Sequence, residues 1–143
     1  MVVIRPDRAL LRQLEALYCA TDKVVAAFSC PASGDCCHLA TTGREPMLFP
    51  LELALILGAL EDQGRPLPPP RPDGACAFLD PSRRCSVYAV RPFGCRTFFC
   101  DRRTGPRRFP EARLFDLTRR LTRLSDQQKE GVNPQAISRL LQA

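Results

Sequence analysis

A chain of 143 residues has room for one domain with a single hydrophobic core. Hydrophobic residues make up 45% of it and charged residues 25%, which is a globular composition and excludes an intrinsically disordered chain. The longest apolar run, residues 53–60, is far shorter than the ~20 residues of a transmembrane helix. Because the first residues become polar before a secretory signal can form, we expect no membrane association and a cytoplasmic location.

The net charge of +6 comes from the second half of the chain. Residues 1–80 carry 7 basic and 10 acidic side chains, whereas residues 81–143 carry 14 basic and 5 acidic ones. Nearly all of the basic residues are arginines, which recognise planar anions well, although a coding bias toward arginine explains the same excess. Nucleic-acid binding is an alternative that we do not favour, since the chain has two tyrosines and no tryptophan for base stacking.

The first predicted helix covers residues 6–28. Pro6 suits the first turn of a helix, where its missing N–H costs nothing, and the carboxylate of Asp7 suits the positive end of the helix dipole. Apolar residues at helical spacing give this helix one buried stripe, formed by Leu10, Leu14, Leu17, Tyr18, Val24, Val25 and Phe28. Cys19 falls on the opposite side, so we expect it to lie outside the core and to take no part in a site.

The second predicted helix covers residues 50–63, with Pro50 at its start and Gly64 ending it. We interpret Glu52 as a helix-start carboxylate rather than as a catalytic group. The following residues, 64–74, contain five prolines, which exclude a helix or a central strand. They predict an extended connector between two cysteine-bearing segments, the first of which is an expected loop over residues 29–46.

The second cysteine-bearing segment covers residues 75–101. Short strands at residues 76–79 and 85–88 are predicted around a turn at residues 80–82. The third predicted helix, residues 110–129, has a buried stripe formed by Leu114, Leu117, Leu121 and Leu124. Its exposed side carries Arg113, Arg119, Arg120 and Arg123. A last short helix is predicted over residues 134–141, with Asn133 as its cap.

Together these elements predict an α-rich fold. We expect a single domain, residues 1–143, in which three or four helices surround an irregular, metal-stapled cysteine-rich centre with at most short strands. The centre spans residues 30–100, between the N-terminal helix and the C-terminal helices.

Eight cysteines in a reducing compartment indicate metal or redox chemistry rather than disulfides. Without Cys19, the candidate metal ligands are Cys30, Cys36, Cys37, Cys76, Cys85, Cys95 and Cys100. Their spacings match no standard zinc finger, and both zinc and an iron–sulfur cluster remain open. Arginines near Cys85 and Cys95, which would depress the thiol pKa values, are Arg83, Arg84, Arg91 and Arg96.

The number of metal sites stays open. Side chains of adjacent residues in an extended segment point apart, so Cys36 and Cys37 share one metal only if a turn such as Gly34-Asp35 redirects them. Seven cysteines plus His38, the single histidine, make eight donors, which is what two four-coordinate sites need. One four-thiolate site with spare cysteines nearby explains the sequence equally well.

Residues 30–100 resemble a known bacterial family of cysteine-cluster proteins. The resemblance is carried by Cys30-Pro-Ala-Ser-Gly-Asp-Cys36-Cys37, by Cys76-Ala-Phe-Leu-Asp, and by the run Cys85-Ser-Val-Tyr-Ala-Val-Arg-Pro-Phe-Gly-Cys95-Arg. The family is named for a Cys-x2-Cys-x2-Cys-Cys motif and implies a zinc- or iron-chelating domain. Its second cysteine falls on Ser33 here, a poor ligand beside thiolates, and our hypothesis is that Cys100 fills the vacant coordination position.

The sequence therefore predicts a cytoplasmic metal-binding protein. An enzyme is the first alternative, since the resemblance includes a longer relative, the flagellin lysine methylase, that is associated with an iron–sulfur cluster. A metal-dependent transferase or a redox enzyme is less favoured, because the chain has neither a glycine-rich cofactor loop after a strand nor a His-Glu-x-x-His helix. No substrate or protein partner can be predicted.

Overall fold

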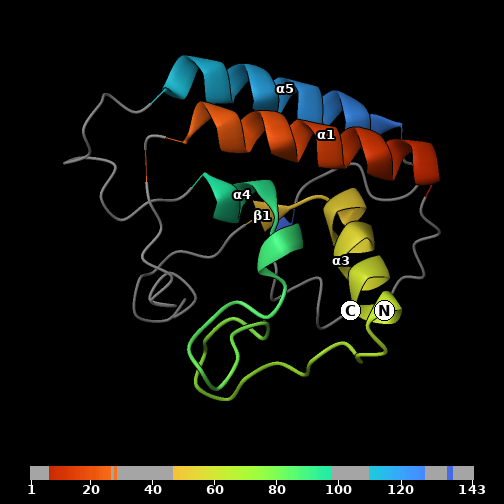
Figure 1. The fold of residues 1–143 in the computed structure, drawn as a ribbon, viewed down its shortest axis with the longest axis vertical. Helices are drawn as coiled ribbons and strands as arrows, with labels where there is room; N and C mark the ends of the chain where they lie inside the picture. Colours follow the sequence, from red (N-terminus) through yellow and green to blue (C-terminus); the bar gives the residue numbers. More distant parts are fainter. Residues whose placement is uncertain (1–6, 27, 29–46, 98–109, 128–134, 137–143) are drawn as a thin grey trace.

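The computed structural model describes residues 7–26, 28, 47–97, 110–127 and 135–136, and this part of the chain is helix-rich, as predicted (Figure 1). In chain order its elements are α1 (Arg8–Val24), β1 (Met47–Leu48), α3 (Pro50–Asp62), the 3₁₀ turn η2 (Tyr88–Val90), α4 (Phe93–Arg96), α5 (Glu111–Asp126) and β2 (Gln135–Ala136). Helix α1 lies between α5 on one side and α3 and α4 on the other (Figure 1). No helix in the described ranges has both the length and the apolar character to cross a bilayer.

Helix α1 begins at Arg8, two residues after the predicted start, and ends at Val24, four residues before the predicted end. Asp7 is its N-cap, and the carboxylate accepts a hydrogen bond of 2.8 Å from the N–H of Ala9. The predicted apolar stripe is confirmed, because Leu14 is fully buried and its neighbours along the stripe are buried or half-buried. Although the last helical residue is Val24, Phe28 continues the buried stripe beyond the helix end.

Helix α3 begins at its predicted first residue and ends at Asp62, one residue before its predicted last one. Pro50 is its first residue, and Gly64 ends it with φ +63°, a backbone conformation that a side chain disfavours. The N–H of Gly64 donates to the carbonyl of Glu61 at 3.0 Å, and the N–H of Arg65 donates to the carbonyl of Leu60 at 2.9 Å. This pair of bonds is a Schellman motif, which satisfies carbonyls that the helix end would otherwise leave unpaired.

The apolar side chains form two clusters, and α3 belongs to both. The first cluster packs α1, α3 and α5 together and contains Leu10, Leu14, Leu17, Tyr18, Val25, Phe28, Phe49, Leu51, Leu55, Leu114, Leu117, Leu121 and Leu124. The second lies on another side of α3 and contains Leu48, Leu53, Ile56, Leu60, Cys76, Phe78 and Val87. The leucine stripe predicted for residues 110–129 is confirmed as the face that α5 turns to the first cluster, and its four predicted arginines are exposed.

The predicted last helix is wrong at the residues that the structure describes. Gln135–Ala136 forms strand β2, which pairs antiparallel with β1 in the register Met47 with Ala136 and Leu48 with Gln135. Local helix propensity is a weak preference, and backbone pairing with a distant segment overrides it here. The rest of the predicted helix, residues 137–141, lies outside the described residues.

Candidate metal centre

The segment that follows α3 places two of the predicted ligands against the second cluster. Cys76 is a buried member of that cluster, and the half-buried Cys85 packs against it. An isolated antiparallel bridge joins Leu79 to Cys85, so the two strands predicted here are reduced to a single bridged pair. Two cysteine side chains, nine residues apart in sequence, therefore lie in or against the same apolar cluster, to which one side of α3 contributes.

The turn between these cysteines is closed by backbone hydrogen bonds across it and by the side chain of Asp80. The carboxylate of Asp80 accepts from the hydroxyl of Ser82 at 2.6 Å and from the N–H of Arg84 at 3.0 Å. These two donors hold the pKa of the Asp80 carboxyl below its usual range, with the Ser82 bond as the larger cause. Arg83 takes a positive φ of 65° in the same turn. The turn predicted at residues 80–82 is confirmed.

Two hydrogen bonds join the proline-rich connector to the second cysteine-bearing segment. The guanidinium of Arg65 donates to the carbonyl of Ser86 at 3.1 Å, and that of Arg71 donates to the carbonyl of Leu79 at 3.0 Å. Leu67, between them, packs against the second cluster. Because residues 65–72 are all prolines or residues that precede a proline, their backbone is restricted before folding, and the connector loses little entropy in this position.

The third described ligand candidate, half-buried Cys95, lies in the single-turn helix α4. The carbonyl of Pro92 accepts from the N–H groups of Cys95 and Arg96, both at 3.0 Å. Helix α4 lies against α1 and β1 (Figure 1).

Glu52 of α3 is the functional feature that the sequence interpretation missed. Its carboxylate does accept from the N–H of Phe49 at 3.1 Å, as a helix-start carboxylate does. It also accepts from the hydroxyl of Tyr18 at 2.6 Å and from the N–H of Phe93, the first residue of α4, at 2.7 Å. Its side chain is 1% exposed, and this burial raises the pKa of Glu52 despite the three donors.

Tyr18 connects this carboxylate to Arg96. Burial is the largest cause that raises the pKa of the Tyr18 phenol well above its ordinary value, and the neighbouring Glu52 adds to it. The guanidinium of Arg96 lies over the Tyr18 ring, 4.1 Å from its centroid. Tyr18 of α1 thus contacts two buried charged groups, the Glu52 carboxyl through its hydroxyl and the Arg96 guanidinium through its ring.

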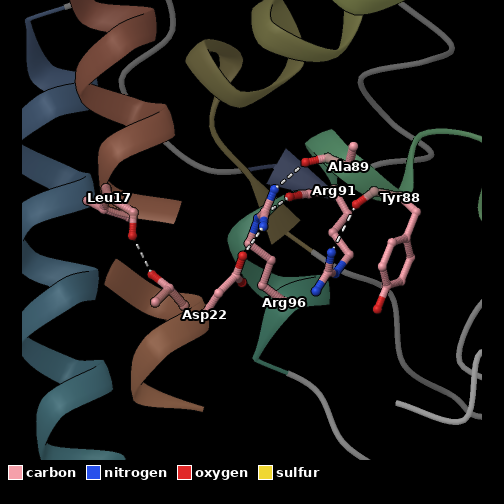
Figure 2. A network of polar contacts seen from close by, with 7 residues as sticks. Leu17, Asp22, Tyr88, Ala89, Arg91 and Arg96 are labelled. Carbon is pink, nitrogen blue, oxygen red and sulfur yellow. Dashed lines mark hydrogen bonds and ion pairs between the residues drawn. The ribbon is translucent and has the colours of Figure 1, made fainter. Parts of the chain in front are cut away.

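Arg96 is the one buried member of the four arginines predicted to lie near the cysteines. Figure 2 shows its guanidinium between α1 and the segment that precedes α4: it donates to Asp22 at 2.9 Å, to the carbonyl of Ala89 at 2.7 Å and to that of Arg91 at 2.8 Å. Arg91 donates to the carbonyl of Tyr88 and stacks over its ring at 3.9 Å (Figure 2). The hydrogen bonds of Arg96 therefore join α1 to the segment that precedes α4.

The remaining cysteines and His38 fall into two groups. Cys19 is exposed on α1, which confirms that it lies outside the core. The other candidates lie outside the described residues, namely Cys30, Cys36, Cys37, His38 and Cys100. Within the described residues, no three histidine, cysteine, aspartate or glutamate side chains form a group able to hold a metal ion. A complete site therefore needs ligands from outside the described ranges.

Comparison with known proteins decides the family. A family model described as "CxxCxxCC: Putative zinc- or iron-chelating domain" matches residues 29–113, which is more than half of the chain. The chain belongs to this family. The matched region begins one residue before Cys30 and includes α3, the connector, α4 and the start of α5. Neither a curated protein nor a solved structure matches the chain.

Proposed function

We propose that this CxxCxxCC protein binds zinc or an iron–sulfur cluster through its cysteines. The ligands are drawn from Cys30, Cys36, Cys37, Cys76, Cys85, Cys95 and Cys100. The observation that carries the proposal is that three cysteines from the family-matched region belong to segments that contact α3 or its apolar cluster. Two of them pack in or against the second cluster, and the helix of the third donates a hydrogen bond from its first N–H, that of Phe93, to the Glu52 carboxylate.

The donor set suits both metals. Thiolates bind zinc and iron–sulfur clusters in preference to hard cations, and a reducing compartment such as the cytoplasm keeps the thiols available. Closing a structural zinc site contributes apparent binding free energies on the order of 10–16 kcal/mol in small peptides. That free energy would hold together two cysteine-bearing segments that are separated by α3 and the proline connector.

The test is purification of the full chain under anaerobic conditions, followed by its visible absorption spectrum and elemental analysis for zinc and iron. A brown protein with several irons per chain supports a cluster, whereas a colourless protein containing zinc supports a zinc site. The number of metal ions per chain then separates one site from two. If neither metal is present and all the thiols react at once with a thiol reagent, the proposal is wrong.

Individual Cys→Ser variants of the seven candidates identify the ligands. Cys19→Ser is the matched control, because this cysteine is exposed on α1 and belongs to neither apolar cluster of the described residues. We expect the control to retain the full metal content and a ligand variant to lose at least part of it. Cys100→Ser also tests whether Cys100 replaces the family cysteine missing at Ser33, since an unchanged metal content would contradict that hypothesis.

A further inference from the structure

Helix α4 cannot hold Cys95 in place by its own hydrogen bonds. It comprises only Phe93–Arg96, and a single isolated turn is unfavourable because several residues are fixed in exchange for very few bonds. The position of the Cys95 thiol therefore depends on what other elements do to the two ends of this turn.

Glu52 of α3 holds the beginning of the turn. Its carboxylate accepts from the N–H of Phe93 at 2.7 Å, a donor that no bond inside a helix can satisfy at this position. The same carboxylate is fixed by the Tyr18 hydroxyl at 2.6 Å and the Phe49 N–H at 3.1 Å. Because Glu52 is 1% exposed and its carboxylate accepts these two further hydrogen bonds, it has little freedom to move.

Arg96 holds the end of the turn. Its guanidinium bonds to the carbonyls of Ala89 and Arg91, just before α4, and to the carboxylate of Asp22 on α1 (Figure 2). Three hydrogen bonds in different directions match the fixed fork of an arginine, and a lysine ammonium on a flexible stem cannot reproduce them together. Arg96 is also the residue directly after Cys95.

We propose that Glu52 and Arg96 are positioning residues that hold the Cys95 thiolate in the ligand set of the metal centre. The inference rests on the proposed function and adds two residues that are not cysteines: Glu52 supports the beginning of α4, and Arg96 supports its end. Tyr18 couples the two, because its hydroxyl bonds to Glu52 and its ring lies under Arg96. Partners behind a metal ligand orient it, and their loss costs roughly 10–100-fold in metal affinity.

The first experiment measures how fast the metal leaves the anaerobically purified full chain. Zinc and iron are followed with chromophoric chelators in excess, for the wild type, Arg96→Lys and Glu52→Gln. We expect each variant to release its metal roughly tenfold or more faster than the wild type. The control is Leu117→Ala, which weakens the packing of α5 in the first cluster but removes none of the hydrogen bonds that Glu52 and Arg96 make, and it should release metal at the wild-type rate. Wild-type release rates in both positioning variants would overturn the inference.

The second experiment separates positioning from general loss of stability. Thiols of the chelator-treated protein are alkylated for increasing times, and modification of Cys95 is compared with that of Cys76 by peptide mass spectrometry. We expect the ratio of the Cys95 rate to the Cys76 rate to rise in Arg96→Lys and Glu52→Gln and to stay at the wild-type value in Leu117→Ala. An unchanged ratio in the two positioning variants contradicts the inference. A wild type that holds no metal refutes the proposed function instead, and this ratio still tests how α4 is held.

Discussion

Replacing Glu52 by alanine tests how much of the fold depends on one buried carboxylate. The change removes the acceptor for three donors, of which the Tyr18 hydroxyl and the Phe49 N–H belong to buried residues and the Phe93 N–H to a half-buried one. Each buried donor left without a partner costs about 1–3 kcal/mol, and the truncation leaves a small cavity as well. We therefore expect Glu52→Ala to lower the free energy of unfolding by about 3–5 kcal/mol, a large part of the 5–15 kcal/mol typical of a domain.

The assay is equilibrium urea unfolding of the metal-free protein at neutral pH, followed by far-ultraviolet circular dichroism. Glu61→Ala is the matched control on the same helix, because Glu61 is exposed and its loss should change the stability by less than about 0.5 kcal/mol. Glu52→Gln should lie between the two, since the amide keeps one oxygen that accepts and the volume of the side chain. If Glu52→Ala lowers the free energy of unfolding by less than about 1 kcal/mol relative to Glu61→Ala, the three donors find other partners and the reasoning is refuted.

Three further predictions concern pH, backbone and metal. Burial raises the pKa of Glu52, so the folded state binds this proton more tightly than the unfolded chain, and stability should fall as the pH rises from about 4 through the folded-state pKa. Glu52→Gln should remove this fall in urea unfolding measured across the pH range. Gly64→Ala should cost about 1–2 kcal/mol because its φ is positive, whereas Gly58→Ala inside α3 meets no atom within 4 Å and should gain about 0.5–1 kcal/mol in thermal unfolding. Removal of the bound metal with a chelator should reduce the protection of amides from hydrogen exchange in residues 75–97 and leave α1 and α5 protected. An equal loss of protection in residues 75–97, α1 and α5 would contradict this prediction.

The helices are predictable from the sequence because their signals are local. The stripe that begins with Leu10 and the one that begins with Leu114 repeat at helical spacing, and both are buried. Gly64 ends α3 through a conformation that depends on its own missing side chain. The turn at Asp80 is likewise closed by residues within four positions of it. Each of these features needs only a few neighbouring residues.

The polar network around α4 cannot be found in the same way. Glu52 receives bonds from residues 34 positions before it and 41 positions after it, and Arg96 bonds to Asp22, 74 positions away. No periodicity or short motif connects such residues. The sequence therefore predicts Glu52 only as a helix-start carboxylate and Arg96 only as a cation near a thiol. Strand β2 was missed for the same reason, since its pairing partner is β1.

The composition of α3 explains why one helix can serve both the core and the cysteine segment. Its residues from Pro50 to Ile56 are all buried, so nearly two turns are covered on every side instead of along one stripe. Such a helix needs apolar cover on the side that α1 and α5 do not reach, and the segment carrying Cys76 and Phe78 supplies it. Glu52 is the polar residue within this buried stretch, and it satisfies its oxygens by bonding to α1 and α4. Because the cover of the core helix and the candidate ligands belong to one segment, any metal bound there stabilises the packing of α3 through mass action.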